Sequence, residues 1–127
     1  MVIRIIIGIY LLIHGVSHLV GFLIPWKIVD MKEEPYKTTL LGGSINAGDT
    51  GIRIIGSLWL LTAVCFIITA IGTFASLNWW RSITLYLSIF SLILCIIGLP
   101  GAKIGILANA VILIYLYAST KKWLPYV

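Results

Sequence analysis

Hydrophobic residues along this chain gather into four long runs, separated by short polar or glycine-containing breaks. The runs cover residues 2–24, 53–74, 79–99 and 102–120. A helix needs about 20 apolar residues to cross the hydrocarbon core of a bilayer, and each run is close to that length. Backbone groups in lipid must be hydrogen-bonded within their own segment, so each run is predicted to be a helix. The sequence therefore predicts a single all-α domain over residues 1–127, a four-helix transmembrane bundle.

The composition favours the same class of protein. Hydrophobic residues make up 61% of the chain and charged residues 10%, whereas a soluble domain has about 25% charged residues. The first run reaches spanning length and lacks a small-residue cleavage site after a short apolar core. We therefore expect a retained helix rather than a signal peptide. The net charge of +5 is spread over loops and span ends, which indicates contact with lipid headgroups and no nucleic-acid partner.

The connections between the runs are very unequal. Residues 75–78 (ASLN) join the second and third runs, and residues 100–101 (Pro-Gly) join the third and fourth, so these neighbours must be antiparallel. One long outer loop, residues 25–52, joins the first two runs. Within it, two short stretches of residues 38–48 flank the Gly-Gly pair at 42–43. This pattern is compatible with a short β-hairpin that caps the helix ends, or with an irregular loop.

Four spans place both ends of the chain on one side of the membrane. Four Lys and Arg residues lie on that side and five on the other, together with all four acids. The positive-inside rule compares these Lys and Arg counts, which are nearly equal for the two sides. Because a mixed-charge loop is readily translocated, we expect a multi-pass protein of the inner (plasma) membrane with cytoplasmic termini. Aromatic belts are expected at both interfaces, with Trp26 at the outer one and Trp79, Trp80 and Trp123 at the inner one.

Small and polar residues recur on one face of each of the two middle spans. In lipid, helices associate through close packing of such residues and through polar contacts, so we interpret both stripes as packing faces. The two cysteines of the chain lie at different depths if these spans are antiparallel, too far apart for a disulfide. The stripes are Thr62, Cys65, Thr69 and Gly72 in one span, and Thr84, Ser88, Ser91 and Cys95 in the other.

Two histidines in the first run are the main candidates for a functional site. His14 and His18 are four residues apart, so they lie on one helical face, one turn from each other. An ionisable group inside a span is costly and by default suggests function. Other polar or aromatic residues fall in the same outer half of the predicted bundle. They are Trp59 and Asn109 within spans, Arg53 and Lys103 at span ends, and Asp49 just before the second span.

Three interpretations of this cluster remain open. In the first, each imidazole hydrogen-bonds to another helix and serves packing. In the second, His18 and Asn109 are polar groups of an outward-facing apolar pocket, where Arg53 and Lys103 favour an anionic or polar head. An enzyme of this kind would use one histidine as a general base. The third is a metal or haem site, which would need Asp49 as a third metal ligand. Two histidines on one helix face cannot occupy opposite axial positions of one haem, which leaves two haems or a site shared between two chains as the haem arrangements.

Motifs of the common enzyme classes are absent from the sequence. It contains no GxSxG, no CxxC and no glycine-rich phosphate loop, and no acid lies within a span to relay protons. We therefore assign no catalytic residue, no metal ligand and no cofactor, and leave enzymatic activity open.

Part of the chain resembles known membrane proteins. The segment GIYLLIHGVSHLVGF is similar to the first span of DoxX-like four-helix membrane proteins. The ordered set HGVSHLVGFLIPW, TTLLGG, GDTGIRIIGSLWLL and GAKIGILANAVIL resembles a group of uncharacterised small four-span bacterial membrane proteins. The resemblance implies the four-span fold. DoxX relatives are linked to membrane redox systems and to thiosulfate or quinone chemistry, but the second group brings no established activity.

These observations lead to one functional hypothesis and one alternative. The hypothesis is that the protein binds a small amphipathic or lipid-like molecule in an outward-facing intramembrane pocket. His14, His18, Trp59 and Asn109 would line it, and Arg53, Asp49 and Lys103 would guard the entrance, with Asp49 paired to Arg53. The alternative is a non-catalytic structural subunit of a larger membrane complex, with both histidines used in packing. The expected partners are membrane lipids and a second copy or another membrane subunit.

Overall fold

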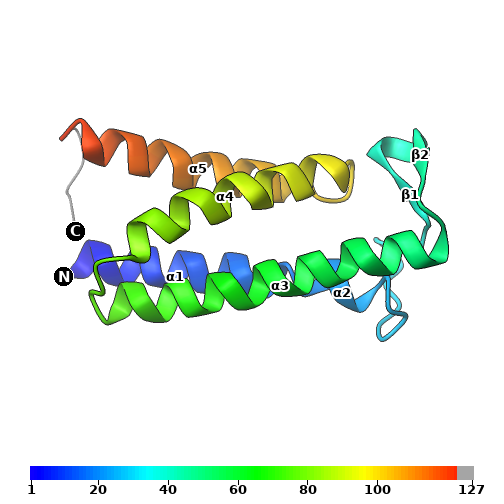
Figure 1. The fold of residues 1–127 in the computed structure, drawn as a ribbon, viewed down its shortest axis with the longest axis horizontal. Coiled ribbons are helices and arrows are strands. Elements are labelled where there is room, and N and C mark those ends of the chain that lie inside the picture. The colour runs from blue at the N-terminus through cyan, green and yellow to red at the C-terminus, as the bar shows by residue number, and fades with distance from the viewer. Residues whose placement is uncertain (123–127) are drawn as a thin grey trace.

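The computed structural model describes residues 1–122 and shows a bundle of long helices with a small hairpin at one end (Figure 1). The all-α fold predicted from the sequence is confirmed. Its elements are α1 (Val2–Ser17), α2 (Val20–Leu23), β1 (Thr39–Leu40), η1 (Leu41–Gly43), β2 (Ile45–Asn46), α3 (Gly48–Phe74), α4 (Trp80–Ile97) and α5 (Lys103–Thr120).

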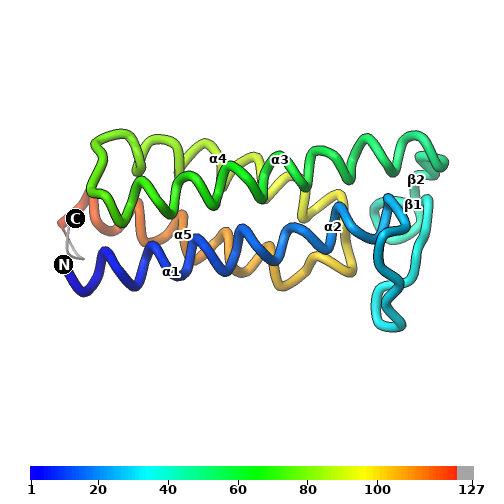
Figure 2. The backbone as a smooth tube through the Cα atoms, turned by 90° about the horizontal axis from the view of Figure 1, so that it is seen from below, coloured from blue at the N-terminus to red at the C-terminus, as the bar shows by residue number. Residues whose placement is uncertain are grey.

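The long helices are arranged as a square. Figure 1 places α1 and α3 in one layer and α4 and α5 in the other, and Figure 2 places α3 with α4 and α1 with α5. Consequently α1 and α4 are diagonal partners. The start of α1 and the end of α5 lie at one end of the bundle, which we call the terminal end. The β-hairpin and the α4–α5 turn lie at the other, which we call the loop end.

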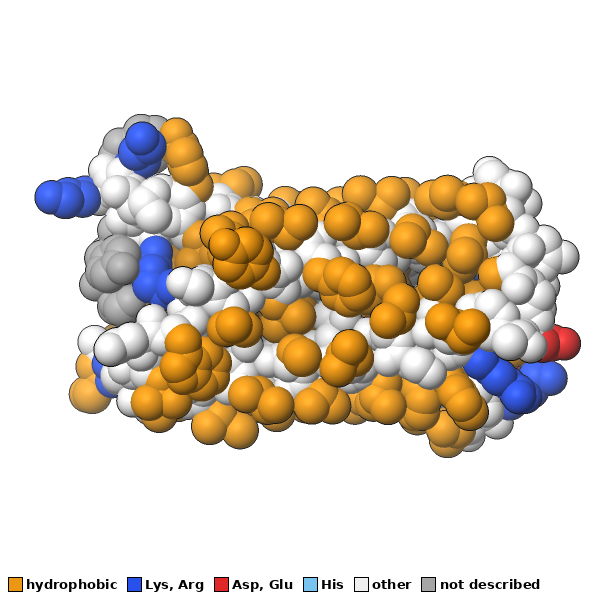
Figure 3. All heavy atoms as spheres, in the orientation of Figure 1, with side chains coloured by type: hydrophobic (Ala, Val, Ile, Leu, Met, Phe, Trp, Pro, Cys, Tyr) orange, Lys and Arg blue, Asp and Glu red, His pale blue; other side chains and the backbone are white. Residues whose placement is uncertain are grey.

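The surface of the bundle is suited to lipid. Within residues 1–122, four segments are long and apolar enough to cross a membrane: Val2–Leu23, Gly48–Phe74, Trp80–Ile97 and Lys103–Thr120. Hydrophobic side chains cover the middle of the face shown in Figure 3, while Lys and Arg lie at both ends. Large aliphatic side chains point outward, such as Ile13 and Ile114, each 65% exposed. Soluble proteins do not expose an apolar surface of this extent, so the chain is a multi-pass integral membrane protein.

The interior contains small and hydroxyl-bearing residues beside a compact apolar cluster. Thr62, Thr69 and Thr84 are buried, and each hydroxyl donates to the backbone carbonyl four residues earlier. Such bonds satisfy the hydroxyl without another helix, which leaves the threonine face free for close packing. The apolar cluster consists of Leu11, Phe66, Ala70, Ile112 and Leu116.

The first span is interrupted, which the continuous hydrophobic run did not predict. The backbone N–H groups of His18 and Leu19 bond to the carbonyls three residues earlier, at 3.1 and 3.0 Å. The side chains of Ser17 and His18 bond to the carbonyl oxygen of His14, at 2.6 and 2.8 Å. These side chains occupy an acceptor that an α-helix gives to its own backbone. The helix therefore ends at Ser17 and resumes at Val20.

The long loop forms the cap that was one of two sequence expectations. Strands β1 and β2 pair antiparallel, with Thr39 opposite Asn46. Gly42 and Gly43 have φ angles of 65° and 92° in the turn between them, a conformation that glycine adopts without strain. The backbone N–H of Gly42 donates to the carbonyl of Leu99 at 2.9 Å, so the hairpin is fixed to the α4–α5 turn.

Two details differ from expectation. Helix α3 begins at Gly48 rather than at Arg53, because the Asn46 side chain accepts the N–H of Gly48 at 3.0 Å and the helix continues up to the hairpin. Trp80 was expected in an interfacial belt, but it is buried in the bundle, whereas Trp26 and Trp79 are exposed at opposite ends. Trp123 lies outside the described residues.

Candidate intramembrane binding site

The two histidines are buried in the loop-end half of the bundle. His14 and His18 are 5% and 2% exposed, and their rings meet edge to face with centroids 4.5 Å apart. The close spacing follows from their i, i+4 relation on α1. The sequence-based expectation that both rings share one face is confirmed by this contact.

A closed set of hydrogen bonds joins the histidines to α4 and α5. His14 Nε2 lies 3.1 Å from Asn109 Oδ1, and Asn109 Nδ2 donates to Ser91 Oγ at 2.9 Å. Ser91 Oγ in turn lies 2.6 Å from His18 Nε2. The four side chains are all buried. We refer to His14, His18, Ser91 and Asn109 as the polar ring.

The partners define which atom donates in each bond. A carbonyl oxygen can only accept, so His18 Nδ1 donates to the carbonyl of His14, and His18 Nε2 accepts from the Ser91 hydroxyl. Asn109 Nδ2 also donates to the Gly105 carbonyl at 2.9 Å, and Asn109 Oδ1 accepts from His14 Nε2. Every donor in the ring thus has an acceptor when both imidazoles are neutral. No other assignment is needed to satisfy the buried groups.

Helix α3 contributes an apolar wall to the polar ring. The Phe66 ring lies 4.8 Å from His14 and 5.4 Å from His18, and Trp59 lies 5.0 Å from His18. Helix α3 comes this close because of Gly15, where a Cβ atom would lie 2.7 Å from the Cβ of Phe66. The histidines are therefore held by hydrogen bonds on one side and by aromatic contacts on the other.

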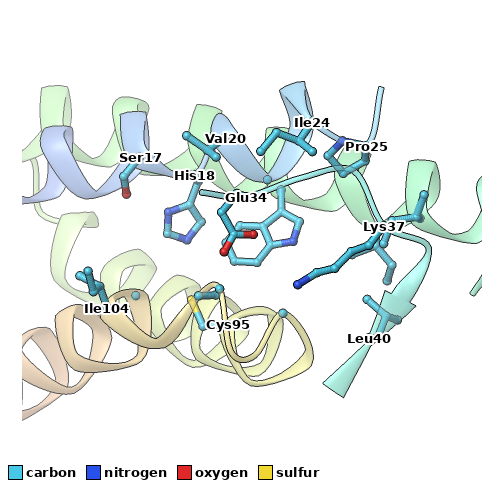
Figure 4. Close-up of a pocket in the computed structure, with 18 of the residues that line it drawn as sticks. Ser17, His18, Val20, Ile24, Pro25, Glu34, Lys37, Leu40, Cys95 and Ile104 are labelled. Carbon is cyan, nitrogen blue, oxygen red and sulfur yellow. The ribbon is translucent and has the colours of Figure 1, made fainter. Parts of the chain in front are cut away.

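Beside His18 the bundle encloses a cavity of about 370 Å³, below the long loop (Figure 4). Most of its lining is aliphatic or glycine, and it comes from α2, the long loop, α3, the α4–α5 turn and the start of α5. The residues with polar or ionisable side chains in the lining are Ser17, His18, Glu34, Lys37, Thr39, Trp59 and Cys95.

The cavity extends to the lipid-facing surface between α2 and α5. Val20 on α2 and Ile104 on α5 both line it and are 37% and 75% exposed. Space at this point depends on Gly105, where a Cβ atom would lie 2.6 Å from Cys95 Sγ. The cavity thus connects the charged loop with the surrounding hydrocarbon.

The seven residues predicted to form the site are not all at the cavity. His18 and Trp59 line it. His14 and Asn109 are buried behind it as members of the polar ring. Asp49, Arg53 and Lys103 are exposed and are not part of the lining.

The expected ion pair between Asp49 and Arg53 is not present in residues 1–122. Asp49 instead accepts a hydrogen bond from the Tyr36 hydroxyl, and this bond raises the pKa of Tyr36 above its ordinary value. The Arg53 guanidinium lies 5.7 Å from the centre of the Trp26 ring, and the Arg53 carbonyl accepts from the Trp26 indole at 3.1 Å. Both contacts attach the long loop to the first turns of α3.

Sequence reasoning missed Glu34 and Lys37 as cavity residues. Figure 4 shows both side chains directed from the loop into the pocket. Glu34 is half-buried against Gly101 of the α4–α5 turn. The charge pattern marks residues 27–37 only as an interfacial segment. Its return across the helix ends depends on contacts distant in sequence, so no local signal distinguishes Glu34 from Glu33.

A metal site receives no support from the described residues. Within residues 1–122, no three His, Cys, Asp or Glu side chains come together in a group that could hold a metal ion. Asp49, the ligand that the metal interpretation required, bonds to Tyr36.

The fold and surface define the class: a small four-span integral membrane protein. Comparisons with models of protein families, with curated proteins and with solved structures find no match to this chain. The similarity of the first span to DoxX-like proteins therefore stays a resemblance, and the redox chemistry of those proteins is not carried over.

Proposed function

We propose that this protein binds a small amphipathic, lipid-like molecule in the cavity beside His18. The observation that carries the proposal is a mostly apolar cavity of about 370 Å³, whose charged lining side chains among the described residues, Glu34 and Lys37, both belong to the loop. Ligand pockets are typically about 300–1,000 Å³ and mostly apolar, with a few polar groups that fix orientation. An amphipathic molecule fits this division, since its apolar part can leave between α2 and α5.

In this proposal the polar ring fixes the position of His18, which lines the cavity. Both nitrogens of His18 are engaged within the protein, one with the His14 carbonyl and one with Ser91. The imidazole of His18 therefore contacts the ligand with the surface of its ring and offers it no free hydrogen-bond donor. His14 and Asn109 act indirectly, because they fix Ser91 and the carbonyl that orient His18.

We also propose the orientation expected from the sequence. The loop end faces outward and the termini lie in the cytoplasm, in the inner (plasma) membrane of the cell. All four acids of the chain belong to the loop-end side. The charged residues in the segments that border the terminal end are all Lys or Arg. The positive-inside rule counts Lys and Arg and gives nearly equal numbers for the two sides, four and five, so this orientation rests on the ready translocation of the mixed-charge loop.

The proposal can be tested with neighbouring isoleucines of α3. Ile55 lines the cavity, whereas Ile54 is 59% exposed and does not. Ile55→Trp should fill part of the cavity, and Ile54→Trp should place the same indole in lipid. Native mass spectrometry of protein extracted in mild detergent should show a retained lipid-like molecule in the wild type and in Ile54→Trp, and its loss in Ile55→Trp. Equal retention in all three proteins would contradict the proposal.

A second candidate function is a structural subunit of a membrane complex, alone or as repeated copies. The observation in its favour is the polar ring, because ring nitrogens that serve helix packing need no ligand. This candidate predicts a stoichiometric membrane partner, or a second copy, after extraction. A monomer that carries lipid and no other protein would count against it.

A further inference from the structure

One carboxylate and one ammonium group face the cavity from the long loop. Glu34 and Lys37 both line the space, and Figure 4 shows their side chains directed into it. The rest of the lining carries no other Asp, Glu, Lys or Arg among the described residues. The cavity therefore has two charges of opposite sign at one end.

These two charges are not paired within residues 1–122. The structure records no ion pair within 4.0 Å between Glu34 and Lys37, and no hydrogen bond from either side chain to another described group. Glu34 is nevertheless half-buried, with its carboxylate against the backbone of Gly101. Two nearby cations do have partners: Lys27 of the loop lies 4.6 Å above the Tyr36 ring, and Arg53 of α3 lies over Trp26. A half-buried carboxylate gains most from a cationic hydrogen-bond donor.

We infer that the cavity selects a phospholipid whose headgroup is a zwitterion with a primary amine. The lipid ammonium donates to the Glu34 carboxylate, and its phosphate lies at the Lys37 ammonium. The inference rests on the proposed function and names the chemical class of its ligand.

The balance of charge excludes the simpler headgroups. An anionic head without an amine would satisfy Lys37 but would place a second negative charge beside Glu34. The cations that could offset this charge, Arg53 and Lys103, do not line the cavity. A cationic head would satisfy Glu34 and repel Lys37. A zwitterion is the charge pattern that matches both groups at once.

The chemistry of Glu34 further favours a primary amine over a quaternary one. A carboxylate forms its strongest hydrogen bonds with charged N–H donors. A quaternary ammonium has no N–H and retains only the Coulomb attraction. Its methyl groups would also need space beside Gly101, where the carboxylate already lies against the backbone.

The depth of the site suits such a lipid. The charged end lies under the loop, at the end of the spans, where a headgroup resides. The acyl chains follow the opening marked by the exposed side chains of Val20 and Ile104 into the bilayer. The lipid therefore needs only its head and the first part of its chains inside the protein.

The test compares three lipids with identical acyl chains: phosphatidylethanolamine, phosphatidylcholine and phosphatidylglycerol. Each is titrated against delipidated full-length protein in detergent, and bound lipid is counted by native mass spectrometry. We expect phosphatidylethanolamine to bind about tenfold or more tightly than either competitor, since one charge-assisted hydrogen bond is worth at least about 1.4 kcal/mol. Equal affinity for all three lipids in the wild type overturns the inference, whether or not any variant folds.

Two variants and two matched controls locate the effect. Glu34→Gln should remove the preference for phosphatidylethanolamine over phosphatidylglycerol, and Lys37→Gln should weaken the binding of both lipids. Glu33→Gln and Lys32→Gln change exposed charges of the same loop outside the lining, and should leave the preference intact. If Glu33→Gln acts like Glu34→Gln, general surface charge explains the preference and the inference is overturned.

The same titration separates this inference from the proposed function. If Ile55→Trp abolishes binding while the wild type takes all three lipids equally, the cavity binds lipid without selecting its head. The inference then fails and the proposed function stands. If Ile55→Trp leaves binding and preference unchanged, both fail.

Discussion

The loop-end and terminal-end halves of this bundle are held together in different ways. In the loop-end half, His14, His18, Ser91 and Asn109 connect α1, α4 and α5 by directed hydrogen bonds. In the terminal half, the same helices surround a smaller cavity of about 160 Å³, lined by aliphatic and aromatic side chains and Thr84. Helices in lipid gain no hydrophobic energy from association. Directed bonds occur in the terminal half too, since Arg81 on α4 donates to the buried Ser119 hydroxyl on α5. What distinguishes the loop-end half is the closed polar ring of four buried side chains, and we conclude that this ring fixes how α1, α4 and α5 fit together there.

The largest expected effect comes from the centre of the polar ring. Asn109→Leu would remove the acceptor of His14 and a donor to Ser91, leaving both buried. We expect a loss of about 2–3 kcal/mol in the free energy of unfolding, because each buried polar group without a partner costs about 1–3 kcal/mol and measured values in membranes are at the lower end. Thr84→Val is the comparison in the other half, since Thr84 bonds only to its own helix. Equal losses in denaturation by sodium dodecyl sulfate would break the contrast between the halves.

Glycines on α1 provide the next comparison. A Cβ atom at Gly15 would meet the Phe66 Cβ at 2.7 Å and the Ala63 carbonyl oxygen at 3.2 Å, neither of which can rotate away. The three atoms nearest to a Cβ atom at Gly8 all belong to the ring of Phe74, a side chain that is 40% exposed and free to turn. We expect Gly15→Ala to cost about 2 kcal/mol and Gly8→Ala much less, by the usual cost of overpacking. Thermal unfolding in detergent measures both, and a larger effect at Gly8 would contradict the account.

Two serines of α4 give a matched pair with a smaller effect. Ser91 and Ser88 are both fully buried, one turn apart, but only Ser91 belongs to the polar ring. Among residues 1–122, the Ser88 hydroxyl has no hydrogen-bond partner. Ser91→Ala should cost about 1 kcal/mol of unfolding free energy, whereas Ser88→Ala should be neutral or stabilising, because it removes an unsatisfied group. The same denaturation assay measures both variants. An equal loss of unfolding free energy for both serines would show that the polar ring does not contribute to stability.

The smallest effect concerns the attachment of the loop. The bond to Asp49 raises the pKa of Tyr36 above its ordinary value of 10.0, so the attachment is fully present below pH 10 and is lost as pH rises through the higher folded pKa. A spin label at exposed position 44 should therefore keep the same mobility from pH 6 to pH 9 and become more mobile only above about pH 10. In Tyr36→Phe the label should be mobile throughout. A mobility change near pH 7 in the wild type would assign the attachment to another group.

Sequence patterns predicted the features that depend on length and local chemistry. Run length predicted the spans, and the Gly-Gly pair at positions 42–43 was compatible with the hairpin that forms there and equally with an irregular loop. The break at His18 was missed because it depends on which side chains take the His14 carbonyl. Hydrophobicity predicts the depth of a residue but not the direction it faces around the bundle. Ser91 was therefore interpreted only as a packing residue, although it bonds to His18 across the bundle.

The long loop shows the same limit for the site. Arg53 and Lys103 were chosen because they lie at the ends of predicted spans, where the sequence alone predicts how deep a charge lies in the membrane. Glu34 and Lys37 reach the cavity because hairpin contacts with Leu99 fold the loop over the helix ends. Such contacts between distant segments are not encoded in any single stretch of residues.

The central claim is that lipid enters the loop-end half and not the terminal half. A phosphatidylethanolamine with a photoreactive diazirine near its headgroup can be crosslinked to the protein in nanodiscs and mapped by peptide mass spectrometry. We predict labels on cavity residues of α2, α3 and the α4–α5 turn, competed by unlabelled phosphatidylethanolamine and reduced in Ile55→Trp. Labels concentrated on Ile6 and Val111 of the terminal-half cavity, or spread evenly over the lipid-facing surface, would contradict the claim.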